Sequence, residues 1–293
     1  MCRTFDRLSL VIEQLKSLSK ALAAVLQKTI LCLVLSALAL AEAEPSPHQD
    51  LQKITQRGVL KVAMHAVDHP PFFMHDNHGN LVGLDVDLAK MIASELGVQV
   101  EFLRTATSFE GVVDQVMRQE ADMAISKISL TLNRAKRVLY TDPYFVFRQA
   151  LLINRILLEQ YPTGISVAHL AERSDIKIAV LEGTSYAQFA ERLFPKASLM
   201  RAQDWHAEIT PAVAEGLVLA AFRDELEVIR ALRTIPQGTL KMVAVVLSDR
   251  EDPLMMVLPP QSHGLRLWLN LFLRAKSVRF NLDYLKQHYR DYL

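Results

Sequence analysis

One segment of this chain, residues 124–134, combines hydroxyl side chains with a single arginine. Arg134 offers a planar fork of N–H donors that matches a carboxylate, and Ser129 and Thr131 add hydroxyl groups close by. Such a segment can form a pocket for a small acid. It can equally be a strand-to-helix turn in which the hydroxyls cap the helix and Arg134 is a solvated surface charge. The segment alone leaves both interpretations open.

The composition excludes several classes of function. Hydrophobic residues make up 51% of the 293 residues, which is enough for a packed core. The net charge is +1 and there is no basic run, so we expect no nucleic-acid partner. Both cysteines, Cys2 and Cys32, lie near the N-terminus, and we therefore expect no disulfide and no catalytic thiol beyond it.

The sequence predicts no cofactor and no metal site. The glycines fit neither the dinucleotide-binding nor the phosphate-loop pattern. Four histidines, His65, His69, His75 and His78, lie close together in the chain. Their stretch is rich in proline and has no repeated acidic pairing, so we do not predict a metal centre there.

Residues 1–43 differ from the rest of the chain and predict a signal peptide or an N-terminal anchor. Scattered basic residues precede an apolar run, residues 30–41, which ends in small residues resembling a cleavage site. The run is shorter than the ~20 residues that a membrane-spanning helix needs. We expect an exported, periplasmic protein, with an uncleaved membrane tether as the alternative.

Beyond the leader, strand-like and helix-like patterns alternate, which indicates an α/β fold, a parallel sheet with helices on its faces. Two such series follow one another, and we predict two similar Rossmann-like lobes. The expected strands lie at residues 60–64, 98–102, 122–125, 176–180, 218–222, 243–247 and 254–258. The chain is expected to close with two helices.

Motifs spread from residue 51 to the C-terminus resemble the periplasmic solute-binding proteins for polar amino acids, solute-binding family 3. Each motif alone is weak, but their order and spacing together are specific. In chain order they are Gly58-Val59-Leu60-Lys61-Val62, His69-Pro70-Pro71-Phe72, Gly83-Leu84-Asp85-Val86-Asp87, Ser129-Leu130-Thr131-Leu132-Asn133-Arg134, Thr141-Asp142-Pro143-Tyr144, Leu181-Glu182-Gly183-Thr184-Ser185 and Ala220-Ala221-Phe222-Arg223-Asp224.

The resemblance implies the type II periplasmic-binding-protein fold, in which two crossover strands join two lobes and the ligand binds in the cleft between them. The chain would leave lobe 1 near Arg148 and return near Asp252. Lobe 1 would then comprise residues 51–148 plus 251–293, and lobe 2 residues 149–250. Ligand binding would close the hinge between them.

The resemblance also implies roles for individual residues. Arg134 would hold the ligand α-carboxylate, and Ser129 would assist it. Thr184 and Ser185 would place backbone N–H groups at a helix start on the same carboxylate, with a plain N-cap as the alternative for Thr184. Asp224 would bind the α-ammonium, and its alternative is an N-cap for the helix that follows.

Three further candidates depart from the family pattern or are ambiguous. His69 replaces the usual aromatic wall residue, and Phe109 either compensates for it or belongs to the core. Lys127 stands where the family commonly has glycine or serine, with its carbonyl on the ligand amine. Its ammonium either reaches the ligand side chain, which would favour an acidic or carbonyl-bearing amino acid, or points to solvent.

We predict a binding protein, not an enzyme: a monomer that captures a polar amino acid and delivers it to a membrane transporter permease. Some members of this fold are dehydratases of cyclic amino-acid precursors, which need a poised carboxylic acid. Glu182, Asp224 or Glu225 could supply it, so a cyclohexadienyl dehydratase remains one alternative. A ligand-binding domain tethered to, or sensing for, a transporter or receptor is the other.

Overall fold

The computed structural model describes residues 22, 26–30, 48–161 and 166–293. The predicted leader therefore lies almost wholly outside the described residues. Within these ranges, no helix combines the length and the apolar character that crossing a bilayer requires.

A mixed sheet of eight strands, in the order β4-β1-β5-β10-β6-β9-β7-β8, forms the frame of residues 48–293. Strands β1, β4 and β5 run parallel to one another, as do β7, β8 and β9. The bounds are β1 Val59–His65, β4 Gln99–Ala106, β5 Met123–Ala124, β6 Leu139–Asn154, β7 Lys177–Leu181, β8 Ser198–Ala202, β9 Ala220–Asp224 and β10 Met242–Leu258, with a separate two-stranded sheet of β2 Met74–His75 and β3 Leu81–Val82.

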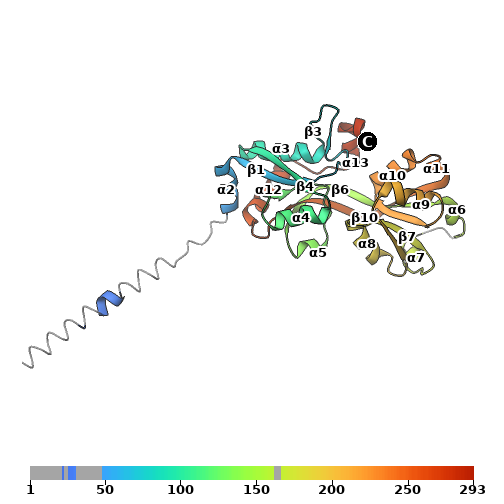
Figure 1. The fold of residues 1–293 in the computed structure, drawn as a ribbon, viewed down its shortest axis with the longest axis horizontal. Helices are drawn as coiled ribbons and strands as arrows, with labels where there is room; N and C mark the ends of the chain where they lie inside the picture. The colour runs from blue at the N-terminus through green and yellow to red at the C-terminus, as the bar shows by residue number, and fades with distance from the viewer. Residues whose placement is uncertain (1–21, 23–25, 31–47, 162–165) are drawn as a thin grey trace, which may run out of the picture. The chain divides into compact units, whose positions relative to one another are not determined.

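Strands β6 and β10 are the two long antiparallel strands that join the lobes (Figure 1). At one end β10 pairs with β5, and at the other β6 pairs with β9. Arg148 pairs with Glu251 and Phe147 with Asp252, so the predicted crossing points lie side by side. The prediction of two separate strands at 243–247 and 254–258 is wrong, because one strand runs through both with an irregular register between Val246 and Glu251.

Helices cover both faces of each lobe, and Figure 1 shows them in two groups, one around each lobe. We define the first lobe as β1–β5 with α2–α5, α12 and α13, and the second lobe as β7–β9 with α6–α11. The bounds are α2 Gln49–Arg57, α3 Leu84–Leu96, α4 Phe109–Met117, α5 Leu132–Ala135, α6 Arg155–Leu158, α7 Val167–Ala171, α8 Ser185–Leu193, α9 Thr210–Ala214, α10 Glu225–Thr234, α11 Gly238–Lys241, α12 His263–Ala275 and α13 Leu282–His288, with a π-turn η1 at Trp205–Ile209 and a 3₁₀ turn η2 at Arg290–Tyr292.

The strands alternate between two cores because successive side chains point to opposite faces. In β1, Leu60 and Val62 enter a core with α3 and α12, and Ala63 enters one with α4. In β7, Ile178 packs toward α8 and Ala179 toward α9 and α10. The prediction of two α/β lobes joined by two crossover strands is confirmed, while the residue boundaries of the lobes stay a prediction.

Gly83 fixes the start of α3 against the loop that precedes it. The N–H groups of Leu84 and Asp85 donate to the carbonyls of Pro71 and Phe72. This approach is so close that a Cβ on Gly83, where φ is +125°, would lie 2.4 Å from the Phe72 carbonyl oxygen. Only glycine fits here, and the contact holds Asp85 in its buried place.

We therefore predict that Gly83→Ala lowers the free energy of unfolding by about 3 kcal/mol or more, because overpacking adds to backbone strain. Gly97→Ala is the matched control, since Gly97 also has positive φ but has open space around it. Its expected cost is the strain alone, about 1–2 kcal/mol. Urea unfolding of both variants measures the difference, and equal losses would contradict the packing argument.

Candidate functional site

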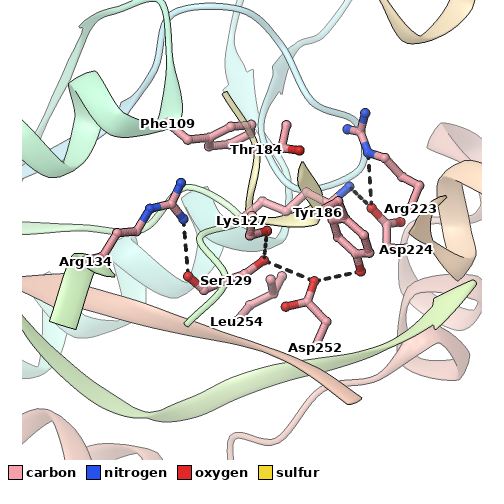
Figure 2. A pocket seen from close by; sticks show the side chains of 11 residues that line it. Phe109, Lys127, Ser129, Arg134, Thr184, Tyr186, Arg223, Asp224, Asp252 and Leu254 are labelled. Atoms are coloured by element: carbon pink, nitrogen blue, oxygen red, sulfur yellow. Dashed lines mark hydrogen bonds and ion pairs between the residues drawn. The ribbon is translucent and has the colours of Figure 1, made fainter. Parts of the chain in front are cut away.

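A pocket with an empty volume of about 360 Å³ opens between the two lobes. Figure 2 shows its lining side chains converging from both lobes and from β10. They are Phe109, Lys127, Ser129, Arg134, Thr184, Ser185, Tyr186, Arg223, Asp224, Asp252 and Leu254. Seven of the eight sequence-predicted site residues are among them.

Arg134 is a buried residue and not a solvated surface charge, being 2% exposed. It lies in α5, whose first turn is capped by the Thr131 hydroxyl, which accepts the Arg134 N–H. The Nε group donates to Glu110 Oε1 at 2.7 Å, and Nη1 donates to the Ser129 carbonyl at 3.3 Å. Nη2 is buried with no partner among the described residues. One arm of the guanidinium is thus held in place while the other remains able to donate.

A chain of hydroxyl groups links the two lobes at Asp252. Ser185 donates to the Ser129 hydroxyl at 2.9 Å, and Ser129 donates to Asp252 Oδ2 at 3.1 Å. Tyr186 donates to the same oxygen at 2.9 Å. Burial raises the pKa of Asp252 to about 6, although both hydrogen bonds stabilise its anion. Asp252 Oδ1 is buried without a partner among the described residues.

Thr184 begins α8 but does not cap it with its side chain. Its hydroxyl donates to the Leu181 carbonyl at 2.7 Å and makes no capping hydrogen bond with the first turn of the described helix. Thr184 therefore occupies the N-cap position of α8 without capping the helix through its side chain. The N-terminal N–H groups of this nine-residue helix can instead bind an anion beside Ser185.

Lys127 is buried and points away from solvent. Its backbone has φ of 50°. Its Nζ lies 3.2 Å from Asp224 Oδ2 and 3.4 Å from Glu227 Oε1, both in the second lobe. The ammonium also lies over the rings of Phe72 and Phe147, 5.5 and 5.2 Å from their centroids. The side chain therefore pairs with protein carboxylates across the cleft.

Asp224 uses both carboxylate oxygens within the protein. Its Oδ1 accepts the Glu227 N–H at 3.1 Å, so the N-cap alternative is confirmed as a contact. Its Oδ2 faces Lys127 and lies 3.8 Å from the Nε of Arg223. Although burial opposes it, the charges of Lys127, Arg223 and Arg230 lower the pKa of Glu227 to about 2. The Lys127 ammonium thus faces an ionised Glu227 at neutral pH.

Phe109 forms one wall of the pocket, while His69 lies behind it. The rings of His69 and Phe109 are 5.3 Å apart, and His69 is not among the lining residues. Burial, followed by the positive charge of Lys127, lowers the pKa of His69 to about 3, which makes this ring neutral at physiological pH. The predicted aromatic wall is therefore Phe109, supported by His69.

Sequence reasoning missed four lining residues: Tyr186, Arg223, Asp252 and Leu254. Arg223 and Tyr186 directly adjoin predicted residues, so their position in the motifs was an available signal. Asp252 lies at the predicted return to lobe 1, but no local signal indicated that its side chain, or that of Leu254, faces the pocket. Among the described residues, no group of histidine, cysteine and acidic side chains could hold a metal ion.

Asp85 is a buried residue that binds the backbone of Lys127. Its carboxylate accepts the Lys127 N–H at 2.7 Å and the Tyr144 hydroxyl at 2.9 Å, and the residue is fully buried. Burial raises the pKa of Asp85 to about 7, against the effect of both hydrogen bonds and of the Lys127 charge.

Comparison with known proteins identifies what the chain is similar to. The family model described as bacterial extracellular solute-binding proteins, family 3, matches residues 60–289. An arginine-binding periplasmic protein of Mannheimia haemolytica is 31% identical over 87 residues, 30% of this chain and 36% of the relative. A cyclohexadienyl dehydratase of Pseudomonas aeruginosa is 32% identical over 119 residues, which are 41% of this chain and 42% of the relative. The chain thus matches less than half the length of either relative.

A solved structure gives wider coverage. The crystal structure of an ancestral amino acid-binding protein, a precursor of cyclohexadienyl dehydratase, covers 83% of this chain and 98% of its own, with a TM-score of 0.63 and 28% identity. The similarity therefore extends over both lobes.

We predict that Asp85→Asn becomes more stable relative to the native protein as the pH rises from 5 to 7. Because the pKa of Asp85 is raised, the folded state keeps a proton that the unfolded state loses above a pKa of about 4. This proton stabilises the folded protein, and its contribution to the free energy of unfolding is lost as the pH rises toward 7. Asp85→Asn has no such proton to lose, so the difference in the free energy of unfolding between the variant and the native protein should change by about 2 kcal/mol over this pH range. Urea unfolding at both pH values measures it.

The exposed Asp87 of the same helix supplies the control, since Asp87→Asn removes a carboxylate that is not buried, and comparison of the two variants isolates the effect of burial. A constant difference for Asp85→Asn would contradict the assignment of a proton to buried Asp85.

Proposed function

Because the chain belongs to family 3 of the bacterial extracellular solute-binding proteins, we propose that it captures a small carboxylate-bearing solute between its lobes and delivers it to a membrane transporter. The periplasm is the proposed location, in keeping with the leader and with the relative named as periplasmic. Binding at a cleft between lobes joined by two strands allows hinge closure around the solute.

The observation that carries the proposal is the buried, unpartnered Nη2 of Arg134 at the pocket. A buried donor without an acceptor is costly, and a carboxylate oxygen is the strongest acceptor it can receive. The Ser129 and Ser185 hydroxyls and the start of α8 face the same pocket from the two lobes. Arg134 would therefore anchor the carboxylate in the first lobe while α8 engages it from the second.

Amino acids are the first solutes to screen, since the relatives' names include an arginine-binding protein and an ancestral amino acid-binding protein. Phe109 would provide the apolar wall for the body of the solute.

Dehydration of a cyclohexadienyl acid is a second candidate, supported by Asp252. This buried carboxyl lines the pocket, has one unpartnered oxygen and has a pKa raised to about 6, which suits a proton donor. The carboxylates of Glu182 and Glu225 do not line the pocket. Incubation with prephenate and measurement of the ultraviolet absorbance tests this candidate, and an unchanged spectrum would remove it.

We predict that Arg134→Ala weakens binding of any carboxylate solute by at least about a hundredfold, because a charged hydrogen bond in a buried site is lost. Arg134→Lys should lose most of the affinity as well, since lysine lacks the fork geometry. Thermal-shift titration over the amino acids and small organic acids measures the effect, as a solute that binds only the folded state raises the unfolding midpoint.

Arg137→Ala is the matched control. Arg137 also pairs with Glu110, at 2.8 Å, but it does not line the pocket. This variant should keep the shifts of the native protein. Undiminished shifts in Arg134→Ala would show that the carboxylate binds elsewhere.

A further inference from the structure

The carboxylate expected to receive a ligand ammonium, Asp224, is already occupied by a cation of the protein itself. Lys127 Nζ lies 3.2 Å from Asp224 Oδ2, and Arg223 Nε lies 3.8 Å from the same oxygen. The other oxygen caps α10 through the Glu227 N–H. Figure 2 shows Lys127 and Arg223 both directed at Asp224. An incoming ammonium would have to share Asp224 with Lys127, and each oxygen of this carboxylate already has a partner within the protein.

Displacing the Lys127 ammonium from Asp224 would leave a buried positive charge without its nearest carboxylate. The Lys127 side chain is 7% exposed and lies over two phenylalanine rings. Away from Asp224 it would retain only Glu227, whose carboxylate also pairs with Arg230 at 3.3 Å. A second ammonium beside Lys127 would place like charges together in a buried site. The pocket therefore discriminates against a ligand cation at this position.

Two guanidinium groups, in contrast, have donors to offer. Arg134 Nη2 and Arg223 Nη1 are both buried without partners among the described residues, and the two residues are 2% and 6% exposed. Arg223 rests its guanidinium over the Trp205 ring, 5.2 Å from the centroid, which leaves its in-plane N–H groups for hydrogen bonds. In the view of Figure 2, Arg134 and Arg223 stand at opposite ends of the pocket.

Cationic side chains outnumber acidic ones in the pocket lining. Among the described residues, the lining holds Lys127, Arg134 and Arg223 against Asp224 and Asp252. Glu110 and Glu227 pair with these cations from outside the lining.

We propose that the solute is a small dicarboxylate without an ammonium group, held at one end by Arg134 and at the other by Arg223. Lys127 takes the place that the ammonium of an amino acid would fill. The inference rests on the proposed function, since it names the chemical class of solute for the same pocket.

The test compares acids that share a carbon skeleton and differ in the amine: succinate with L-aspartate, and glutarate with L-glutamate, with L-arginine as a further amino acid. Calorimetric titration of the purified protein should give a Kd at least about tenfold lower for a dicarboxylate than for its amino-acid counterpart, because the added ammonium must compete with buried Lys127. Arg223→Gln should remove most of the dicarboxylate affinity.

The outcomes separate the two levels of the proposal. An amino acid that binds as tightly as its amine-free counterpart, or binding of amino acids alone, overturns the inference and leaves the proposed function standing. Binding of none of these acids overturns both.

Two variants test the role of Lys127 directly. Lys127→Ala exposes Asp224 and should shift the preference toward L-glutamate by at least about tenfold relative to glutarate. The exposed Lys136 supplies the control, and Lys136→Ala should leave the preference unchanged.

Lys127→Met keeps the length and the apolar stem of the side chain and serves where Lys127→Ala fails to fold. It should shift the preference toward L-glutamate in the same direction as Lys127→Ala, because it also removes the ammonium from Asp224. An unchanged preference in both variants would overturn the inference.

Discussion

A buried ammonium group needs carboxylates within reach, and for Lys127 both come from the opposite lobe. Its backbone belongs to the first lobe, where Asp85 accepts its N–H, while Asp224 and Glu227 belong to the start of α10. The ion pairs therefore fix where α10 begins relative to the first lobe. Arg230, one turn further along α10, adds hydrogen bonds to the carbonyls of Pro70 and Tyr292. The cost of an unpaired buried charge keeps this side of the pocket in place.

The two sides of the pocket are thus held by different kinds of interaction. On the Asp224 side the lobes meet through charges, and on the Arg134 side they meet through hydroxyl groups that converge on Asp252. The Ser185–Ser129 hydrogen bond joins two neutral hydroxyl groups, and such a bond costs less to exchange for one with a ligand than a buried ion pair does. A solute oxygen can therefore replace hydroxyl contacts near Ser129 more readily than a solute cation can replace Lys127.

Local signals in the sequence were sufficient for most of the fold and for part of the site. Alternating apolar residues located strands such as β1 and β7, and the motif around Arg134 located a buried arginine with a capped helix. The continuity of β10 could not be read, because its polar middle, residues 248–251, looks like a turn, and the register with β6 is irregular there.

The partner of Lys127 was equally out of reach of the sequence. It lies about a hundred residues away, and whether a lysine is buried depends on what the other lobe presents to it. His69 shows the same limit: its motif placed it near the ligand, but the packing of Phe109 puts it one layer behind. The residues missed at the pocket are those that tertiary structure alone brings there.

The irregular register of β10 has a mechanical consequence. Between the pairs Val246–Ala150 and Glu251–Arg148, four residues of β10 face a single residue of β6, and residues 248–251 are exposed. The proposed closure of the lobes would bend β10 here, where residues 247–250 lie outside the regular register with β6. Substitutions in this stretch would then change the fraction of molecules in the binding-competent form, and the apparent Kd of every solute rises as that fraction falls. The hinge would thus set the affinity, while the pocket would decide which solute binds.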